Sequence, residues 1–119
     1  MFKIFEALAP DLELKPGDIL FRQGEPGLNC FIIHSGSVDL FYNGRRIAEA
    51  PPGEILGEMA LVDQNLRSAT AVAGPNGAKL YDVSKERFLR LVKERPEFSL
   101  EVLRIMARRL RAQVAIIAG

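Results

Sequence analysis

The 119-residue sequence contains one cysteine, one histidine and no tryptophan, and these scarcities exclude several classes of protein. A lone Cys30 cannot form an intramolecular disulfide, which excludes a disulfide-stabilised secreted scaffold. Cys30 and His34 together supply too few ligands for a structural zinc site, so we expect no metal. This use of cysteine favours the reducing cytoplasm as the compartment.

The sequence also lacks long apolar runs. No stretch reaches the roughly 20 apolar residues that a membrane-spanning helix needs. The first eleven residues contain Glu6 and Asp11 instead of the sustained apolar core of a signal peptide. Hydrophobic residues make up 48% and charged residues 26%, which is ordinary for a folded globular protein. We therefore expect one domain over residues 1–119, without a membrane span.

A net charge of +1 hides an uneven distribution of charge. Residues 1–84 carry seven basic and eleven acidic side chains, whereas residues 85–119 carry nine basic and four acidic ones. A basic tail is a candidate for contact with nucleic acid or a membrane surface, but acidic residues are interspersed within it. We expect a solvated helix face here, and no nucleic-acid binding within this chain.

Turn residues divide the sequence from about residue 12 to residue 83 into short apolar segments, a pattern that predicts strands. The predicted strands are Ile19–Phe21, Cys30–Ile33, Val38–Tyr42, Arg46–Ala48, Ala69–Val72 and Ala78–Tyr81. Asn43-Gly44 predicts a two-residue hairpin turn, because both positions accept positive φ. The expected fold is mainly β with flanking α-helices, an antiparallel jelly-roll-like β-roll.

Helical periodicity replaces the strand pattern after Asp82. Ser84 is a predicted N-cap for a helix over about 84–95, whose apolar face comprises Phe88, Leu91 and Val92. A second helix, over about 97–117, is predicted by apolar residues three and four positions apart, namely Leu103, Met106, Leu110, Val114 and Ile117. A short helix within Phe2–Leu8 precedes the roll. The apolar stripe must be covered by the roll or by a second copy, so a homodimer through this helix is a candidate assembly.

The segment from Leu56 to Ala73 carries the chemistry of the chain. Gly57 has no Cβ, so backbone can approach a ligand there. A short turn of helix after it would offer free amides to an anion. Arg67 supplies a planar charged fork that can hold two phosphate oxygens. Together, at this spacing, these features predict a pocket for one cyclic phosphate.

This segment resembles the cyclic nucleotide-binding domain shared by catabolite-activator regulators, cyclic-nucleotide-dependent protein kinases and nucleotide-gated channels. Residues 14–25 are similar to the opening strand and turn of that family, and residues 31–38 to its glycine-marked hairpin. The resemblance covers nearly the whole chain. Gln64 and Leu66 stand where the family often has glycine and proline, which implies a less pre-shaped loop.

The resemblance implies the ligand-binding residues Gly57, Glu58, Met59, Ala60, Arg67, Ser68 and Ala69. Backbone amides near Gly57 would bind the phosphate together with Arg67, and Glu58 would accept the ribose 2′-hydroxyl. Ser68 would donate its hydroxyl to the phosphate. In this family a small residue after the arginine favours adenine, whereas a threonine there favours guanine. Serine lies between the two, with a hydroxyl available to either base, and we expect cyclic AMP ahead of cyclic GMP.

These features predict a non-catalytic sensor that converts ligand binding into movement of its C-terminal helix, with Leu103, Met106 or Leu110 closing over the base. The alternative is a ligand-free structural or dimerisation module in which Glu58 and Arg67 form an ion pair. A phosphodiesterase is disfavoured, because His34 stands alone and the carboxylates form no ligand cluster by spacing. The sequence does not identify the effector protein that such a sensor would control.

Overall fold

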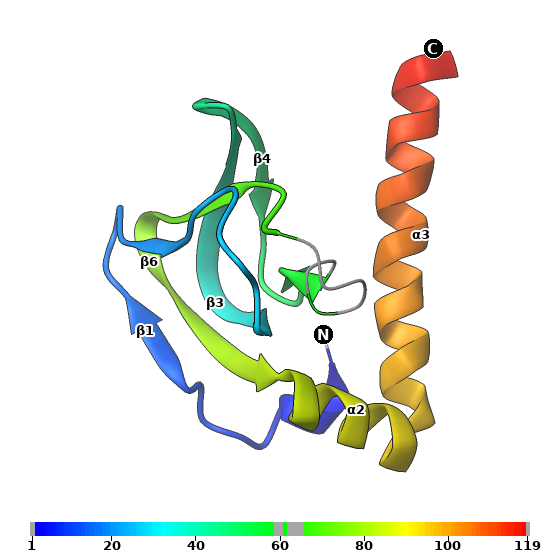
Figure 1. Cartoon of the computed structure of the whole chain (residues 1–119). Helices are drawn as coiled ribbons and strands as arrows, with labels where there is room; N and C mark the ends of the chain where they lie inside the picture. Colours follow the sequence, from blue (N-terminus) through cyan, green and yellow to red (C-terminus); the bar gives the residue numbers. More distant parts are fainter. Residues whose placement is uncertain (1, 59–60, 62–65, 119) are drawn as a thin grey trace.

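The computed structural model describes residues 2–58, 61 and 66–118, which form a rolled antiparallel sheet flanked by helices (Figure 1). The strands of the described residues are β1 (Leu12–Leu14), β2 (Ile19–Phe21), β3 (Asn29–Tyr42), β4 (Arg45–Ala50), β5 (Ile55–Leu56) and β6 (Thr70–Ser84). Their order is β1-β6-β3-β4, with β2 added to β6 and β5 added to β3. The prediction of a mainly β fold with flanking helices is confirmed.

Two long strands take the place of four predicted short ones. β3 and β6 pair over most of their lengths. β3 contains two of the predicted strands, and β6 contains one predicted strand and all but the first residue of another. The pairing shifts register on both sides of Gly36, whose φ is +78°, so β3 bends there instead of ending. A Cβ at Gly36 would overlap the backbone of Gly77 on β6. The sequence signal at Gly36 therefore marks a bend in the roll.

The hairpin between β3 and β4 is the predicted one. Tyr42 pairs with Arg45, which leaves Asn43 and Gly44 as the two turn residues. Both have positive φ, +49° and +80°, as a turn matching the twist of the two strands requires. This prediction is confirmed. The turn could be predicted because its sequence signal is local and needs no tertiary contact.

Helical segments with described bounds flank the roll, namely η1 (Lys3–Phe5), α2 (Lys85–Glu94) and α3 (Pro96–Ala118). The Ser84 side chain accepts a hydrogen bond from the Arg87 backbone N–H at 3.1 Å, which confirms the predicted N-cap. η1 is shorter than the segment expected to be helical. Within the described residues, no helix combines the length and apolar character needed to cross a bilayer.

The buried core has two parts. The roll cluster lies within the sheet and contains Phe31, Ile33, Val38, Ala50, Leu56, Ala71, Ala73, Ala78 and Leu80. The helix-side cluster joins the sheet to the helices and contains Phe2, Phe5, Cys30, Ile32, Ile55, Leu61, Tyr81, Val83, Phe98, Val102 and Ile105. The last three residues of this second cluster attach the first half of α3 to the sheet.

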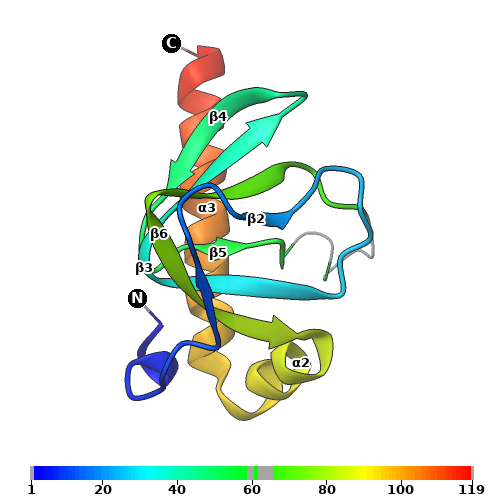
Figure 2. The same cartoon turned by 90° about the vertical axis from the view of Figure 1, so that its left-hand side faces the viewer.

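α3 passes along one side of the roll and continues toward the end of the sheet where β4 lies (Figures 1 and 2). Its predicted apolar stripe does not all face the roll. Met106 packs on the helix-side cluster, whereas Leu103 and Leu110 are 61% and 62% exposed. The side chains of Val114 and Ile117 lie outside the described part of the chain.

Candidate functional site

Gly57 and Arg67 meet between β5 and the start of β6. Gly57 follows β5 with a φ of +79°, and the next residue, Glu58, is already helical. A Cβ at Gly57 would overlap Nη1 of Arg67, so only glycine allows the guanidinium this close. The Arg67 backbone is held by two hydrogen bonds to the turn that contains Gly24 and Glu25.

The Arg67 guanidinium is bonded mainly to backbone oxygens. Nη1 donates to Gly57 O at 3.1 Å, and Nη2 donates to Asn29 O at 2.7 Å and to Asn29 Oδ1 at 3.2 Å. Its carbon lies 4.4 Å from the ring centre of Phe21, which closes the apolar side. Among the described residues, the buried Nε has no hydrogen-bond partner.

Electrostatically, Arg67 is a buried cation with no ion-pair partner in the described part of the chain. Arg67 is 6% exposed, and this burial lowers the pKa of its guanidinium. The negative charges of Glu25, Asp82 and Glu58 raise the same pKa, but by less than burial lowers it. Arginine nevertheless stays protonated at neutral pH. A buried charge is costly unless it is paired, so an anion in contact with this guanidinium would stabilise it.

Glu58 is the second charged residue that is buried among those described, at 4% exposure. Its carboxylate pairs with Arg109 on α3, with Oε1 2.5 Å from Nη1. Nη2 of Arg109 also contacts Glu54 Oε2 at 3.1 Å and the carbonyl oxygen of Ile55. The ion pair between Glu58 and Arg67 expected for a ligand-free module does not form; each of these residues has other partners.

These residues surround a cavity of about 90 Å³. A single buried water needs roughly 10–15 Å³ by this measure, so there is room for a group of several atoms. The cavity lining consists of Phe21, Leu40, Leu56, Gly57, Glu58, Arg67, Ser68, Ala69 and Arg109. Five of the seven predicted site residues are therefore brought together. The other two, Met59 and Ala60, lie outside the described residues.

Two polar residues at the site were not foreseen from the sequence. Asn29 lies at the start of β3 and holds Arg67, and Arg109 reaches the cavity from α3. The α3 residue that lines the cavity is thus a cation and not one of the apolar candidates Leu103, Met106 and Leu110. The sequence did contain a signal for the contact of Arg109. Basic residues are in excess after residue 84 and acidic residues before it, and Arg109 pairs with Glu54 and Glu58 across this division.

The remaining candidates for reactive chemistry lie apart from the cavity lining. Cys30 is fully buried, and burial raises the pKa of its thiol to about 12, so it is not a thiolate at neutral pH. Nδ1 of His34 lies 3.2 Å from the Ser35 hydroxyl. No group of three or more histidine, cysteine, aspartate or glutamate residues with metal-binding geometry occurs within the described ranges.

The comparison with known proteins places this site in a family. Residues 11–95 match the family described as the cyclic nucleotide-binding domain. The chain belongs to this family. The cavity residues Glu58 and Arg67 lie within the matched residues, whereas Arg109 lies beyond them.

Similar proteins include enzymes and regulators. A cGMP-dependent protein kinase of Toxoplasma gondii is 40% identical over 67% of this chain and 8% of the kinase. The cyclic AMP receptor protein of Thermus thermophilus is 35% identical over 91% of this chain and 57% of that protein. The crystal structure of the Thermus thermophilus catabolite activator protein superposes with a TM-score of 0.79, at 31% identity, over 97% of this chain and 61% of that chain. This chain thus spans less than two thirds of each of these relatives.

Proposed function

We propose that this domain is a cyclic nucleotide sensor in which Arg67 binds the cyclic phosphate. The observation that carries the proposal is a buried guanidinium beside a cavity, with its Nε unbonded among the described residues. A cyclic phosphodiester bears one negative charge, which one arginine can neutralise. The amides of Met59 and Ala60 complete the phosphate site in this proposal.

Glu58 binds the ribose in the same proposal. A carboxylate is a poor ligand for phosphate, but it is a good acceptor for a sugar hydroxyl. Arg109 occupies Oε1 of Glu58, and a carboxylate has further lone pairs that can accept the 2′-hydroxyl. Glu58 therefore lies at the junction between the ligand and α3.

Cyclic AMP is the ligand that we propose, ahead of cyclic GMP. Ser68 lines the cavity directly after the arginine, and it is smaller than the threonine that favours guanine. Both ligands occur among the names of similar proteins: a cGMP-dependent protein kinase matches over 67% of this chain, and the cyclic AMP receptor protein matches over 91% of it. The longer match extends to α3, the helix that contributes Arg109 to the cavity.

The output of the sensor is a change in the position of α3. In the structure, α3 is attached to the pocket by the contacts of Arg109 with Glu54, Glu58 and Ile55. A nucleotide that engages Glu58 changes the partners available to Arg109, and so favours one position of α3 over another. The size of the shift is limited by the difference in ligand affinity between the two positions.

α3 also supplies a surface for self-association. Leu100, Leu103 and Leu110 are 48%, 61% and 62% exposed on this helix, so its outer side offers apolar area to a second copy. This observation supports the homodimer, and it is also what a purely structural module would need. Sedimentation velocity distinguishes the two roles. Cyclic AMP should change the sedimentation coefficient or the monomer–dimer equilibrium of a sensor dimer, and it should change neither for a structural dimer.

Calorimetric titration tests the binding proposal. The wild-type domain is titrated with cyclic AMP, cyclic GMP and linear 5′-AMP, and the Arg67→Ala variant is titrated in parallel. We expect binding of cyclic AMP, weaker binding of cyclic GMP, and loss of both in the variant. Absence of binding at millimolar nucleotide by a folded wild-type domain would reject the proposal. Appearance of linear AMP in the cyclic AMP sample would show an enzyme instead.

A further inference from the structure

Asn29 contacts Arg67 through two of its oxygen atoms. It is the first residue of β3, where it pairs with Ser84 at the end of β6. Its carbonyl oxygen and its side-chain Oδ1 both accept hydrogen bonds from Nη2 of Arg67, at 2.7 and 3.2 Å. The side chain of Asn29 therefore adds a second anchor to a guanidinium nitrogen that the backbone already holds.

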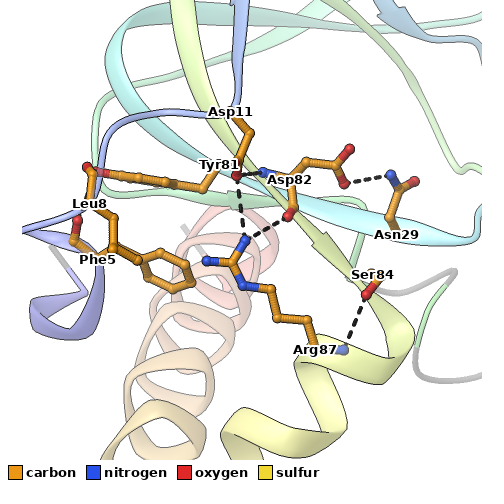
Figure 3. A network of polar contacts seen from close by, with 8 residues as sticks. All are labelled: Phe5, Leu8, Asp11, Asn29, Tyr81, Asp82, Ser84 and Arg87. Atoms are coloured by element: carbon orange, nitrogen blue, oxygen red, sulfur yellow. Dashed lines mark hydrogen bonds and ion pairs between the residues drawn. The ribbon is translucent and has the colours of Figure 1, made fainter.

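The other end of the Asn29 amide faces a carboxylate. Nδ2 donates a 2.6 Å hydrogen bond to Oδ1 of Asp82, and the two side chains point toward each other in Figure 3. The amide oxygen thus meets a cation and the amide nitrogen meets an anion. The flipped amide would place its NH2 group against the guanidinium and its oxygen against the carboxylate, so the charges on both sides fix one orientation.

Asp82 is itself held in place by its main chain. Its backbone N–H donates to Oδ2 of Asp11 at 2.9 Å, and its carbonyl oxygen accepts from Nη1 of Arg87 at 3.1 Å (Figure 3). Arg87 belongs to the first turn of α2, next to the Ser84 cap. The carboxylate that orients Asn29 is therefore attached to a fixed part of the molecule.

We propose that Asn29 is a positioning residue for the phosphate site: held by Asp82, its amide fixes the rotation of the Arg67 guanidinium beside the cavity. The inference rests on the proposed function for its effect on nucleotide affinity, but not for its effect on the arginine itself. Nη2 makes two hydrogen bonds, both to Asn29, whereas Nη1 makes one and Nε makes none among the described residues. Without Oδ1, Nη2 keeps one acceptor and the guanidinium gains freedom to rotate.

Two pairs of variants test this proposal by titration with cyclic AMP. Asn29→Ala should weaken affinity about tenfold, because one hydrogen bond to the charged group is lost. Its matched control is Asn76→Ala at an exposed position of β6, which should leave affinity unchanged. Asp82→Ala should weaken affinity about threefold, whereas Asp82→Asn, with the same loss of charge but an acceptor retained, should stay near the wild-type value.

The combined variant tests whether Asp82 acts through Asn29. In an Asn29→Ala background, Asp82→Ala should have no further effect on affinity, since the amide that it orients is gone. An undiminished effect of Asp82→Ala in that background would overturn the role given to Asp82. Thermal unfolding of each variant shows whether an affinity change reflects loss of fold. Asp82 is exposed, so its variants keep the test available if Asn29→Ala does not fold.

A ligand-free measurement separates this inference from the proposed function. Nitrogen NMR of the Arg67 side chain reports rotation of the guanidinium, which should be slow in the wild type and faster in Asn29→Ala and Asp82→Ala. If the wild type binds no nucleotide, the proposed function fails, and the rotation rates still decide the role of Asn29. Rotation equally fast in the wild type and in Asn29→Ala would overturn the inference, as would equal affinities of Asn29→Ala and Asn76→Ala.

Discussion

Two arginines line the same cavity, and they are held in different ways. Arg67 belongs to the sheet side, is 6% exposed, and bonds mainly to carbonyl oxygens of strands and turns. Arg109 belongs to α3, its side chain is 37% exposed, and it bonds to the carboxylates of Glu54 and Glu58 and to one carbonyl. The first arginine is part of the framework, whereas the second joins a separate helix to that framework.

This difference assigns different parts of a sensor to the two arginines. Carbonyl partners leave the charge of Arg67 uncompensated, so it keeps its attraction for an anion. Carboxylate partners already neutralise Arg109, so its contribution is the attachment of α3 near the ligand. In the proposed sensor, the sheet side provides affinity, and the helix side converts occupancy into movement. Substitutions on the two sides should therefore separate affinity from helix docking.

Removal of the framework arginine should have the largest effect. Arg67→Ala is expected to weaken cyclic AMP binding by about 2–4 kcal/mol, because the charge-assisted hydrogen bonds to the phosphate are lost. Calorimetry measures the change in affinity, and thermal unfolding checks that the fold persists. Unchanged affinity in a folded variant would show that the ligand does not use this arginine.

A methyl group at Gly57 should displace the same arginine without removing it. Gly57→Ala is expected to weaken binding by about 2 kcal/mol, since its Cβ would overlap Nη1 of Arg67. Gly44→Ala is the matched control: Gly44 also has a φ near +80°, but a Cβ added there would meet no heavy atom within 4 Å. Both variants should lose similar stability through backbone strain, and only the first should lose affinity. Equal affinity in the two would contradict the close approach of Arg67.

Removal of the helix arginine should loosen α3. Arg109→Ala is expected to cost about 1–3 kcal/mol of stability, less than a fully buried pair because the Arg109 side chain is 37% exposed. Amide hydrogen exchange in the second half of α3 should become faster. Arg108→Ala is the control, since Arg108 is 67% exposed and makes one 3.4 Å contact with Glu54. The same exchange rates in both variants would show that Arg109 does not hold the helix.

Truncation of Glu58 should have the smallest effect on affinity. Glu58→Ala is expected to weaken cyclic AMP binding by about 1 kcal/mol, through loss of the hydrogen bond to the ribose. The wild type should bind cyclic AMP more tightly than its 2′-deoxy analogue, and this preference should disappear in the variant. If the preference for ribose persists in Glu58→Ala, another group must bind the 2′-hydroxyl.

Features with local causes could be predicted from the sequence. The Asn43-Gly44 turn and the Ser84 cap depend on residues within a few positions of one another. The gap between the predicted strands Cys30–Ile33 and Val38–Tyr42 is a bend at Gly36 within β3. The two-residue strand β5 is too short for a periodic pattern, and its existence depends on pairing with β3.

Contacts between distant elements could not be predicted in the same way. Arg109 pairs with a carboxylate 51 positions earlier, and its direction depends on how α3 packs through Phe98, Val102 and Ile105. Periodicity assigned the apolar residues of α3 to one stripe, but the packing exposes Leu103 and Leu110. Asn29 gave no signal of its own, because its role depends on Arg67 and Asp82 lying on either side of it.

The most direct test of ligand sensing is the distance between the sheet and α3 with and without cyclic AMP. Spin labels on Arg45→Cys in β4 and Arg111→Cys in α3, both exposed positions, report it in a Cys30→Ala background. We predict that saturating cyclic AMP shifts the distance distribution and that Arg67→Ala abolishes the shift. An unchanged distribution in protein that calorimetry shows to be saturated would contradict the account.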